Sequence, residues 1–152
     1  MQLHHDFAQR LPHLVRPTEG EEQPNPEMVI LNEELARQLG FDPDWLRSSE
    51  GIEFLTGRAG GHAMAYSGFQ FGAFNPQMGD GRAMLLGEVE NDGQLWDLHA
   101  KGTGLTPFSR PGSDGRGTLS SMLREYLVSE AMHALGVPTT RALAVISTGR
   151  PI

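Results

Sequence analysis

The sequence predicts an α+β fold, built from an antiparallel sheet and one long helix. The turn Asn91-Asp92-Gly93 separates two apolar runs, 82–89 and 94–101, and this pattern is a strong signal for a β-hairpin. Residues 118–135 carry the longest helical pattern in the chain, and Gly136 follows as its stop. Strands of this kind beside a single long helix are typical of the α+β class.

The earlier part of the chain predicts shorter elements. Residues 1–27 look irregular, with a solvated acidic loop at 19–26. An extended run follows at 26–32, and Asn32 is a good N-cap for a helix over 33–39. Asp42-Pro43 starts a further helical turn, because proline suits the first helical position.

Residues 66–78 hold three of the seven phenylalanines of the chain. Aromatic side chains dominate protein cores, so we expect a buried aromatic plug beneath the sheet. Gln70 and Asn75 fit a core less well, and a binding role for them stays open.

A last strand pattern, 141–147, lies almost at the end of the chain. We expect the sheet to continue in a longer parent protein. A lobe without its partner exposes apolar surface, so we also expect a homodimer or limited stability.

Composition narrows the classes of function. The chain has 152 residues, enough for one domain or one lobe, and a net charge of −7. This acidity argues against nucleic acid and anionic membranes as partners. There is no cysteine, no apolar run approaches the roughly 18 residues of a membrane span, and the N-terminus lacks a signal-peptide pattern. We therefore expect a cytoplasmic protein.

The glycines gather in loops of a kind that binds phosphate. One loop contains Gly79, Gly81 and Arg82, and another, 112–117, precedes the long helix. Exposed backbone N–H groups in such turns cradle phosphate oxygens, and a helix N-terminus adds partial positive charge. Lys101 lies on the polar face of its strand, and Glu125 on the helix is a candidate partner that would hold it toward a nucleotide.

Each of these features also has an ordinary structural explanation. Gly79-Asp80-Gly81 alone is more often a simple turn. A strand lysine beside a helix glutamate is usually a surface ion pair, and Glu130 is a rival partner for Lys101. The six histidines have no metal-ligand spacing, and we expect them to be surface or partly buried residues.

Several long strings in fixed order closely resemble the selenoprotein O (YdiU-like) family. The resemblance runs from about residue 30 to the end of the chain. The strings are Tyr66-Ser67-Gly68-Phe69-Gln70-Phe71-Gly72, Asn75-Pro76-Gln77-Met78-Gly79-Asp80-Gly81-Arg82, Leu98-His99-Ala100-Lys101-Gly102-Thr103-Gly104, Asp114-Gly115-Arg116, Arg124-Glu125 and Ser129-Glu130-Ala131-Met132-His133-Ala134-Leu135-Gly136.

This resemblance implies a protein-kinase-like fold, of which the chain is the N-lobe, and an adenylyltransferase activity. Members of the family are regarded as pseudokinases that transfer AMP from ATP to Ser, Thr or Tyr hydroxyls of proteins, with Mg²⁺ or Mn²⁺. The positions that the family uses to contact ATP fall on Gly79, Gly81, Arg82, Lys101, Asp114 and Gly115. Glu125 falls on the helix glutamate that pairs with the lysine.

The same resemblance divides the chain into an N-terminal extension, 1–65, and a lobe, 66–152. The family's catalytic aspartate and metal ligands would lie downstream of residue 152, so we expect no catalytic residue and no activity in this chain alone. Two alternatives stay open. One is a non-catalytic module that binds a nucleotide or a partner, and the other is the lobe of a phosphoryl-transferring kinase.

Overall fold

The structure is a computed structural model that describes residues 3–151. It confirms the α+β class, with antiparallel sheets and few helices. The chain divides into two compact units. Unit 1 contains the described residues up to Glu22 together with Glu53–Arg116, and unit 2 contains Gln23–Ile52 together with the described residues from Gly117 onward.

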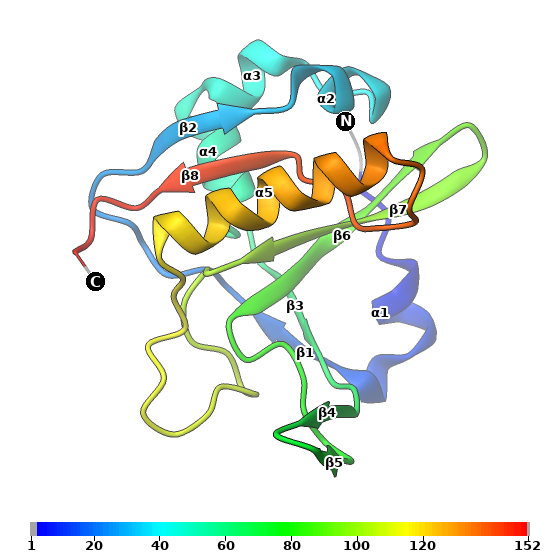
Figure 1. Ribbon diagram of the computed structural model, residues 1–152, viewed down its shortest axis with the longest axis vertical. Coiled ribbons are helices and arrows are strands. Elements are labelled where there is room, and N and C mark those ends of the chain that lie inside the picture. Colours follow the sequence, from blue (N-terminus) through cyan, green and yellow to red (C-terminus); the bar gives the residue numbers. More distant parts are fainter. Residues whose placement is uncertain (1–2, 152) are drawn as a thin grey trace. The chain divides into compact units, whose positions relative to one another are not determined.

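Unit 1 is built on a four-stranded antiparallel sheet (Figure 1). Its strands, in spatial order, are β1 (Val15–Thr18), β3 (Gly61–Met64), β6 (Ala83–Asn91) and β7 (Gln94–Lys101). The predicted hairpin is confirmed as β6 and β7, joined at Asp92 and Gly93, which both have positive φ. Aliphatic side chains along β6 make up much of the buried core of this unit.

The N-terminal segment, which we expected to be irregular, is ordered against β6. It forms α1 (Asp6–Arg10), a 3₁₀ turn (Pro12–Leu14) and β1. The carboxylate of Glu88, which is 2% exposed, accepts hydrogen bonds from the backbone N–H groups of Asp6 (3.1 Å) and Phe7 (2.9 Å). These are the first N–H groups of α1, which have no partner inside the helix, so Glu88 anchors the segment.

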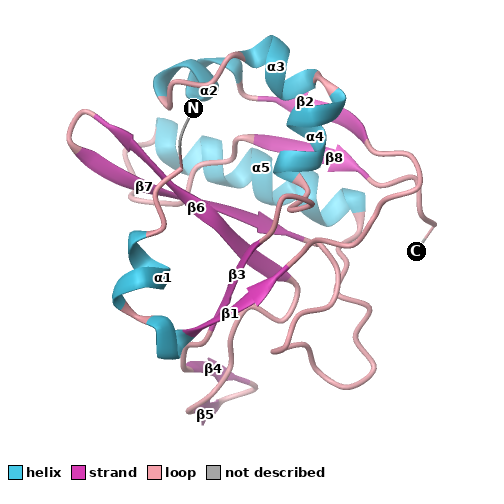
Figure 2. Ribbon diagram, turned by 180° about the vertical axis from the view of Figure 1, so that it is seen from behind, coloured by secondary structure: helices cyan, strands magenta, loops and turns pink. Residues whose placement is uncertain are grey.

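The prediction of a buried aromatic plug is wrong. Residues 68–75 form a small hairpin, β4 (Gly68–Gln70) and β5 (Ala73–Asn75), which projects from one end of unit 1 in both Figure 1 and Figure 2. Phe71 at its tip is 98% exposed, and Phe69 is 75% exposed. Phe69 packs instead across the hairpin on Phe74, at a ring-centroid distance of 5.7 Å. The apolar character of the three rings favours burial, but it does not determine the direction in which a short hairpin projects.

Unit 2 pairs two distant strands, β2 (Glu27–Leu31) and β8 (Ala144–Ser147), in antiparallel register. Three helices of this unit lie between the two strands along the chain: α2 (Glu33–Gln38), α3 (Pro43–Arg47) and α5 (Leu119–Ala134). The helix α4 (Ser49–Leu55) contains the point at which the chain passes from unit 2 to unit 1. The predicted N-cap Asn32 is confirmed, because its side chain accepts a hydrogen bond from the backbone N–H of Leu35 at 3.1 Å. Thr118, which we expected to be the first residue of the long helix, is the N-cap of α5.

The long helix α5 is confirmed, but its apolar side stays largely open. None of its residues is buried, and Leu127 and the following Leu135 are among its most exposed large apolar side chains. Separately, no helix within the described residues is long and apolar enough to cross a membrane.

Replacing Glu88 tests the anchoring of the N-terminal segment. Glu88→Ala leaves two backbone N–H groups without their acceptor, so we expect a loss of about 2–3 kcal/mol in the free energy of unfolding, measured by urea denaturation. Glu88→Gln keeps one acceptor oxygen and should lose about half as much. Equal stability of the alanine variant and the unmodified protein would contradict the role of Glu88.

Candidate nucleotide-phosphate site

The loop 79–82 is held close to the backbone of unit 1 because it has glycine on both sides of Asp80. Gly79 has φ +138°, and a Cβ atom there would lie 2.7 Å from the carbonyl oxygen of Met64 and 2.8 Å from the ring of Phe108. A Cβ atom on Gly81 would lie 3.1 Å from the carbonyl oxygen of Phe108. Only glycine allows this close approach at position 79, where the backbone conformation also disfavours a side chain.

Arg82, the last residue of this loop, lies beside the end of the strand that carries Lys101. Ala83 pairs with Lys101 across the β6–β7 hairpin, and the N–H of Gly102 donates to the carbonyl of Arg82 at 2.6 Å. Both cationic side chains are exposed. Two positive charges therefore lie on neighbouring strand ends, which suits the binding of a polyanion.

The predicted loop 112–117 contacts both the loop 79–82 and the residues that follow Lys101. Gly115 has φ +70°, its carbonyl accepts a hydrogen bond from the N–H of Gly104 at 3.1 Å, and the Arg82 guanidinium donates to the carbonyl of Arg116 at 3.1 Å. Asp114 turns the loop by accepting from the N–H of Arg116 at 3.0 Å. We call the three segments 79–82, 101–104 and 112–116 the loop cluster; it contains six of the predicted residues, Gly79, Gly81, Arg82, Lys101, Asp114 and Gly115.

One acidic side chain that we had expected in a solvated loop helps to hold the cluster. The N–H of Glu21 donates to the carbonyl of Thr103 at 2.8 Å, and its carboxylate pairs with Arg116 at 2.9 Å. The two partners of this ion pair are 95 residues apart in the chain. No local pattern in the sequence signals such a contact.

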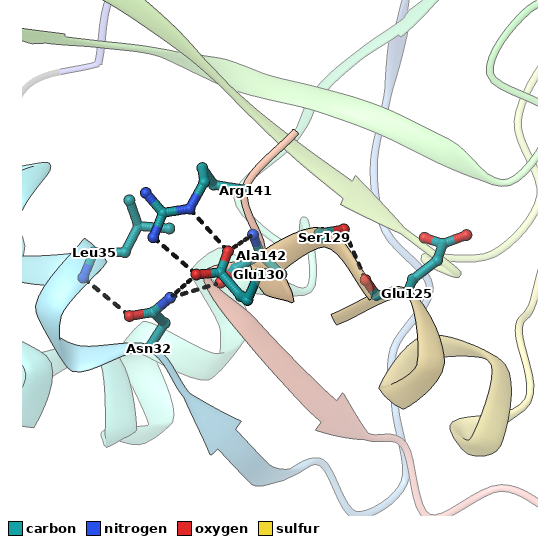
Figure 3. Close-up of polar contacts among 7 residues, drawn as sticks. All are labelled: Asn32, Leu35, Glu125, Ser129, Glu130, Arg141 and Ala142. Atoms are coloured by element: carbon teal, nitrogen blue, oxygen red, sulfur yellow. Dashed lines mark hydrogen bonds and ion pairs between the residues drawn. The ribbon is translucent and has the colours of Figure 1, made fainter. Parts of the chain in front are cut away.

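Glu130 is committed to unit 2. Figure 3 shows its carboxylate facing Arg141 and Asn32. It accepts two hydrogen bonds from the guanidinium of Arg141 (2.9 and 2.8 Å), one from the amide of Asn32 (2.9 Å) and one from the N–H of Ala142 (2.9 Å). The bonds from Arg141 are the largest of the effects that hold the pKa of Glu130 below its usual range. These four bonds favour a structural role for Glu130 over the alternative of a partner for Lys101.

Glu125 lies on the same helix, and its side chain points away from the Glu130 cluster (Figure 3). It is exposed, and its backbone carbonyl accepts a hydrogen bond from the hydroxyl of Ser129 at 2.7 Å. Lys101 belongs to unit 1 and Glu125 to unit 2. Their pairing stays a prediction.

Two further residues, Asp80 inside the loop cluster and His99 beside it, were missed as site candidates. Asp80, inside the loop 79–82, is 2% exposed, and one of its carboxylate oxygens lies 3.0 Å from Nε2 of His99 on β7. The sequence offered one signal, which is a charged residue between two glycines. Only the fold shows that this residue is buried and faces the histidine.

Other parts of the described chain offer less. Unit 1 also has a hollow of about 540 Å³, whose lining includes His5 and His62, but none of the predicted residues. Burial and the charge of His5 lower the pKa of His62. Among residues 3–151, no group of three or more His, Asp or Glu side chains is placed to hold a metal ion.

Comparison with known proteins decides the family. The family model described as "Protein adenylyltransferase SelO" matches the chain over residues 1–152. The chain belongs to the SelO family. The resemblance seen in its sequence strings is thereby confirmed, and it extends over the whole chain.

Curated relatives of this SelO-family chain carry one common name. "Protein nucleotidyltransferase YdiU" of Corynebacterium glutamicum (strain R) is 60% identical over 99% of the chain. The proteins of that name from Corynebacterium efficiens and Mycolicibacterium smegmatis are 59% identical over 96% of the chain and 53% identical over 99% of it. The chain spans about a third of the length of these relatives, with 33%, 31% and 32% of each covered. Nucleotidyl transfer is thus the general chemistry of the family.

The contact between Gly104 and Gly115 is tested by a pair of alanine variants in one loop. Gly115→Ala would place Cβ 2.1 Å from the carbonyl carbon of Gly104, so we expect a loss of about 3 kcal/mol or more in the free energy of unfolding. Gly112→Ala has a similar φ of +78° but no atom within 4 Å of the new Cβ, and should lose about 1–2 kcal/mol. Equal losses for both variants in thermal unfolding would refute the close packing.

The bonds of Glu130 predict a pH dependence of stability. Because its folded-state pKa lies below the usual 4.5, the carboxylate stabilises the folded state at pH values above 4.5, and this contribution is lost as the pH falls through the lowered folded-state pKa. Glu130→Gln should be less stable than the unmodified protein by about 2 kcal/mol at pH 7, and the difference should shrink in acid. Denaturation curves measured from pH 7 to about pH 3 check this; a gap that does not change with pH would speak against it.

Proposed function

We propose that this chain carries the ATP-phosphate-binding part of a protein adenylyltransferase, which transfers AMP from ATP to Ser, Thr or Tyr hydroxyls of proteins. Membership of a family described as a protein adenylyltransferase supports the reaction. The names of the relatives support nucleotidyl transfer in general. The arrangement of the loop cluster supports the place where the nucleotide binds.

The observation that carries the proposal is the meeting of Arg82, Lys101 and Gly115 in one cluster of unit 1. Glycines let the backbone of the loops approach a bound phosphate closely, and the two cations neutralise the negative charge of the phosphate oxygens. The chain as a whole has a net charge of −7, so this local pair of cations is not a consequence of general basicity. The chemistry of these donors fits the triphosphate of ATP.

The proposed reaction breaks one bond and forms another at the α-phosphorus. The substrate hydroxyl oxygen bonds to the α-phosphorus, the bond from the α-phosphorus to the bridging oxygen breaks, and pyrophosphate leaves with the bond's electron pair. Negative charge grows on this leaving group, so Arg82 and Lys101 near it lower the barrier. The hydroxyl proton passes to a base that, by the family resemblance, lies outside this chain.

Mg²⁺ or Mn²⁺ belongs to the same proposal, with ligands outside this chain. The described residues do not offer a group of side chains that fits such an ion, so no step is assigned to them through a metal. We further propose that Glu125 holds Lys101 in place, and that the chain is the N-lobe of a kinase-like fold. Without the remaining two thirds of the relatives' length, the chain alone should not transfer AMP.

The open apolar side of α5 supports one proposal about assembly. This side and the residue that follows the helix expose four leucines, which a partner surface would shield from water: Leu119, Leu123, Leu127 and Leu135. The 152-residue chain on its own is therefore proposed to form a homodimer through this surface.

A labelling experiment tests the reaction. A chimaera in which residues 1–152 replace the matching third of the Corynebacterium glutamicum relative is incubated with ATP labelled at the α- or the γ-phosphate, with the relative itself as positive control. We expect protein to be labelled from the α-phosphate only. Lys101→Met should reduce labelling by about a hundredfold or more, whereas Arg10→Met, which removes an exposed cation on α1, should not.

The outcomes separate the alternatives. Label from the γ-phosphate alone would identify a phosphoryl-transferring kinase and overturn the adenylyltransferase proposal. A chimaera that gives no label from either position, beside an active relative, would favour a non-catalytic binding module.

A further inference from the structure

The carboxylate of Asp80 is buried, although removing a charged group from water is energetically costly. It is 2% exposed, although its loop also contains the exposed Arg82. A buried carboxylate is tolerated only with strong partners. Asp80 has them, because its Oδ2 accepts a hydrogen bond from the N–H of Met64 (2.9 Å) and lies 3.0 Å from Nε2 of His99.

The backbone of Asp80 is fixed as firmly as its side chain. Its N–H donates to the carbonyl of Met64 at 2.9 Å, so Met64 is bonded to both the backbone and the carboxylate of the same residue. The hydroxyl of Thr106 donates to the carbonyl of Asp80, and the hydroxyl of Ser109 donates to the carbonyl of Gly81 at 2.6 Å. These bonds restrict the backbone of the loop, which its two glycines would otherwise leave free.

A neighbouring ring adds a third side chain to this environment. Burial, and then the charge of Asp80 and a hydrogen bond with it, raise the pKa of Tyr66. The carboxylate of Asp80 thus interacts with Met64 on β3, with Tyr66 in the segment after β3 and with His99 on β7.

His99 lies on the same strand as Lys101. His99 and Lys101 are two positions apart on β7, so their side chains share one face of the strand. The contact between Asp80 and His99 therefore joins the loop that ends in Arg82 to the strand that ends in Lys101. The hydrogen bond from the N–H of Gly102 to the carbonyl of Arg82 is a second link between this loop and the end of β7.

We infer that Asp80 is a positioning residue for phosphate binding, which acts through the backbone of Gly81 and Arg82 and, by way of His99, through the strand of Lys101. This inference rests on the proposed function. It assigns to the acidic residue between the two glycines a role that is not direct contact with the nucleotide, since a buried carboxylate would repel phosphate if it faced it.

The test measures ATP binding by calorimetry, in the presence of Mg²⁺, on the 152-residue chain with Asp80→Asn. The asparagine keeps the size of the side chain but weakens the bonds to Met64 and His99, so we expect the dissociation constant to rise about tenfold. His99→Leu, at a more exposed position, removes the other half of the contact and should give a similar rise. Asp97→Asn is the matched control, because it makes the same change of charge on the same face of β7 and should change the dissociation constant less than about twofold.

A double variant separates positioning from general stability. If Asp80 acts through Arg82, Asp80→Asn should weaken ATP binding far less when Arg82→Ala is already present, by about twofold at most. Amide hydrogen exchange without nucleotide gives a second measure. In Asp80→Asn it should speed up at Gly81 and Arg82 and at the end of β7 that carries His99, and stay unchanged at the other end of the β6–β7 hairpin, beside the turn at Asp92 and Gly93.

Each outcome has a definite meaning. Unchanged ATP binding in both Asp80→Asn and His99→Leu would overturn the inference, as would faster exchange throughout unit 1, which would reveal a purely structural role. Absence of ATP binding in the unmodified chain would count against the proposed function instead, and the exchange rates at Gly81 and Arg82 would then decide on the positioning role alone.

Discussion

The buried carboxylate of Asp80 is the interaction on which the loop cluster depends. It lies where β3 ends and β6 begins, and it faces β7 through His99. Glycines on both sides give the chain the freedom to enter this position, and the hydrogen bonds to Met64 remove that freedom again. A flexible sequence thereby acquires one fixed backbone conformation, which is what a site for an extended anion requires.

A second constraint is the close approach of Gly104 and Gly115. It brings the loop before α5 against the end of β7, and Glu21 closes the arrangement through Arg116. Arg82 and Lys101 then lie together, in a chain that is otherwise strongly acidic. Preorganised cations stabilise a charged transition state without reorganising during the reaction. In a family of nucleotidyltransferases, this is the role that the geometry of unit 1 supports.

Much of the local structure was predictable from the sequence. The turn at Asp92-Gly93 and the cap at Asn32 are signals within a few residues of their effects, and both are present. The hairpin at 68–75 was placed wrongly in the core, because the apolar character of three phenylalanines does not determine where a short hairpin points. The N-terminal segment was missed because its order depends on β6, a strand far along the chain.

The candidate site likewise has a part that could be predicted from the sequence and a part that could not. The residues predicted to contact ATP came from sequence strings shared with a family, and the fold brings six of them into one unit. The partners that hold them include Glu21, Asp80 and His99, which act across 95 and 19 residues of chain. The only local signal for them is the position of Asp80 between two glycines. Glu130 was weighed as a partner for the lysine because it lies on the right helix, yet its four hydrogen bonds bind it within unit 2.

The central claim is that the loop cluster binds the phosphates of ATP. A titration of the isotope-labelled chain with ATP, followed by the chemical shifts of its backbone amides in two-dimensional NMR spectra, tests it most directly. The account predicts that the largest shifts fall on Gly79, Gly81, Arg82, Gly102 and Gly115. Shifts that centre instead on the hollow beside His5 and His62, or no shifts at all at saturating ATP, would contradict it.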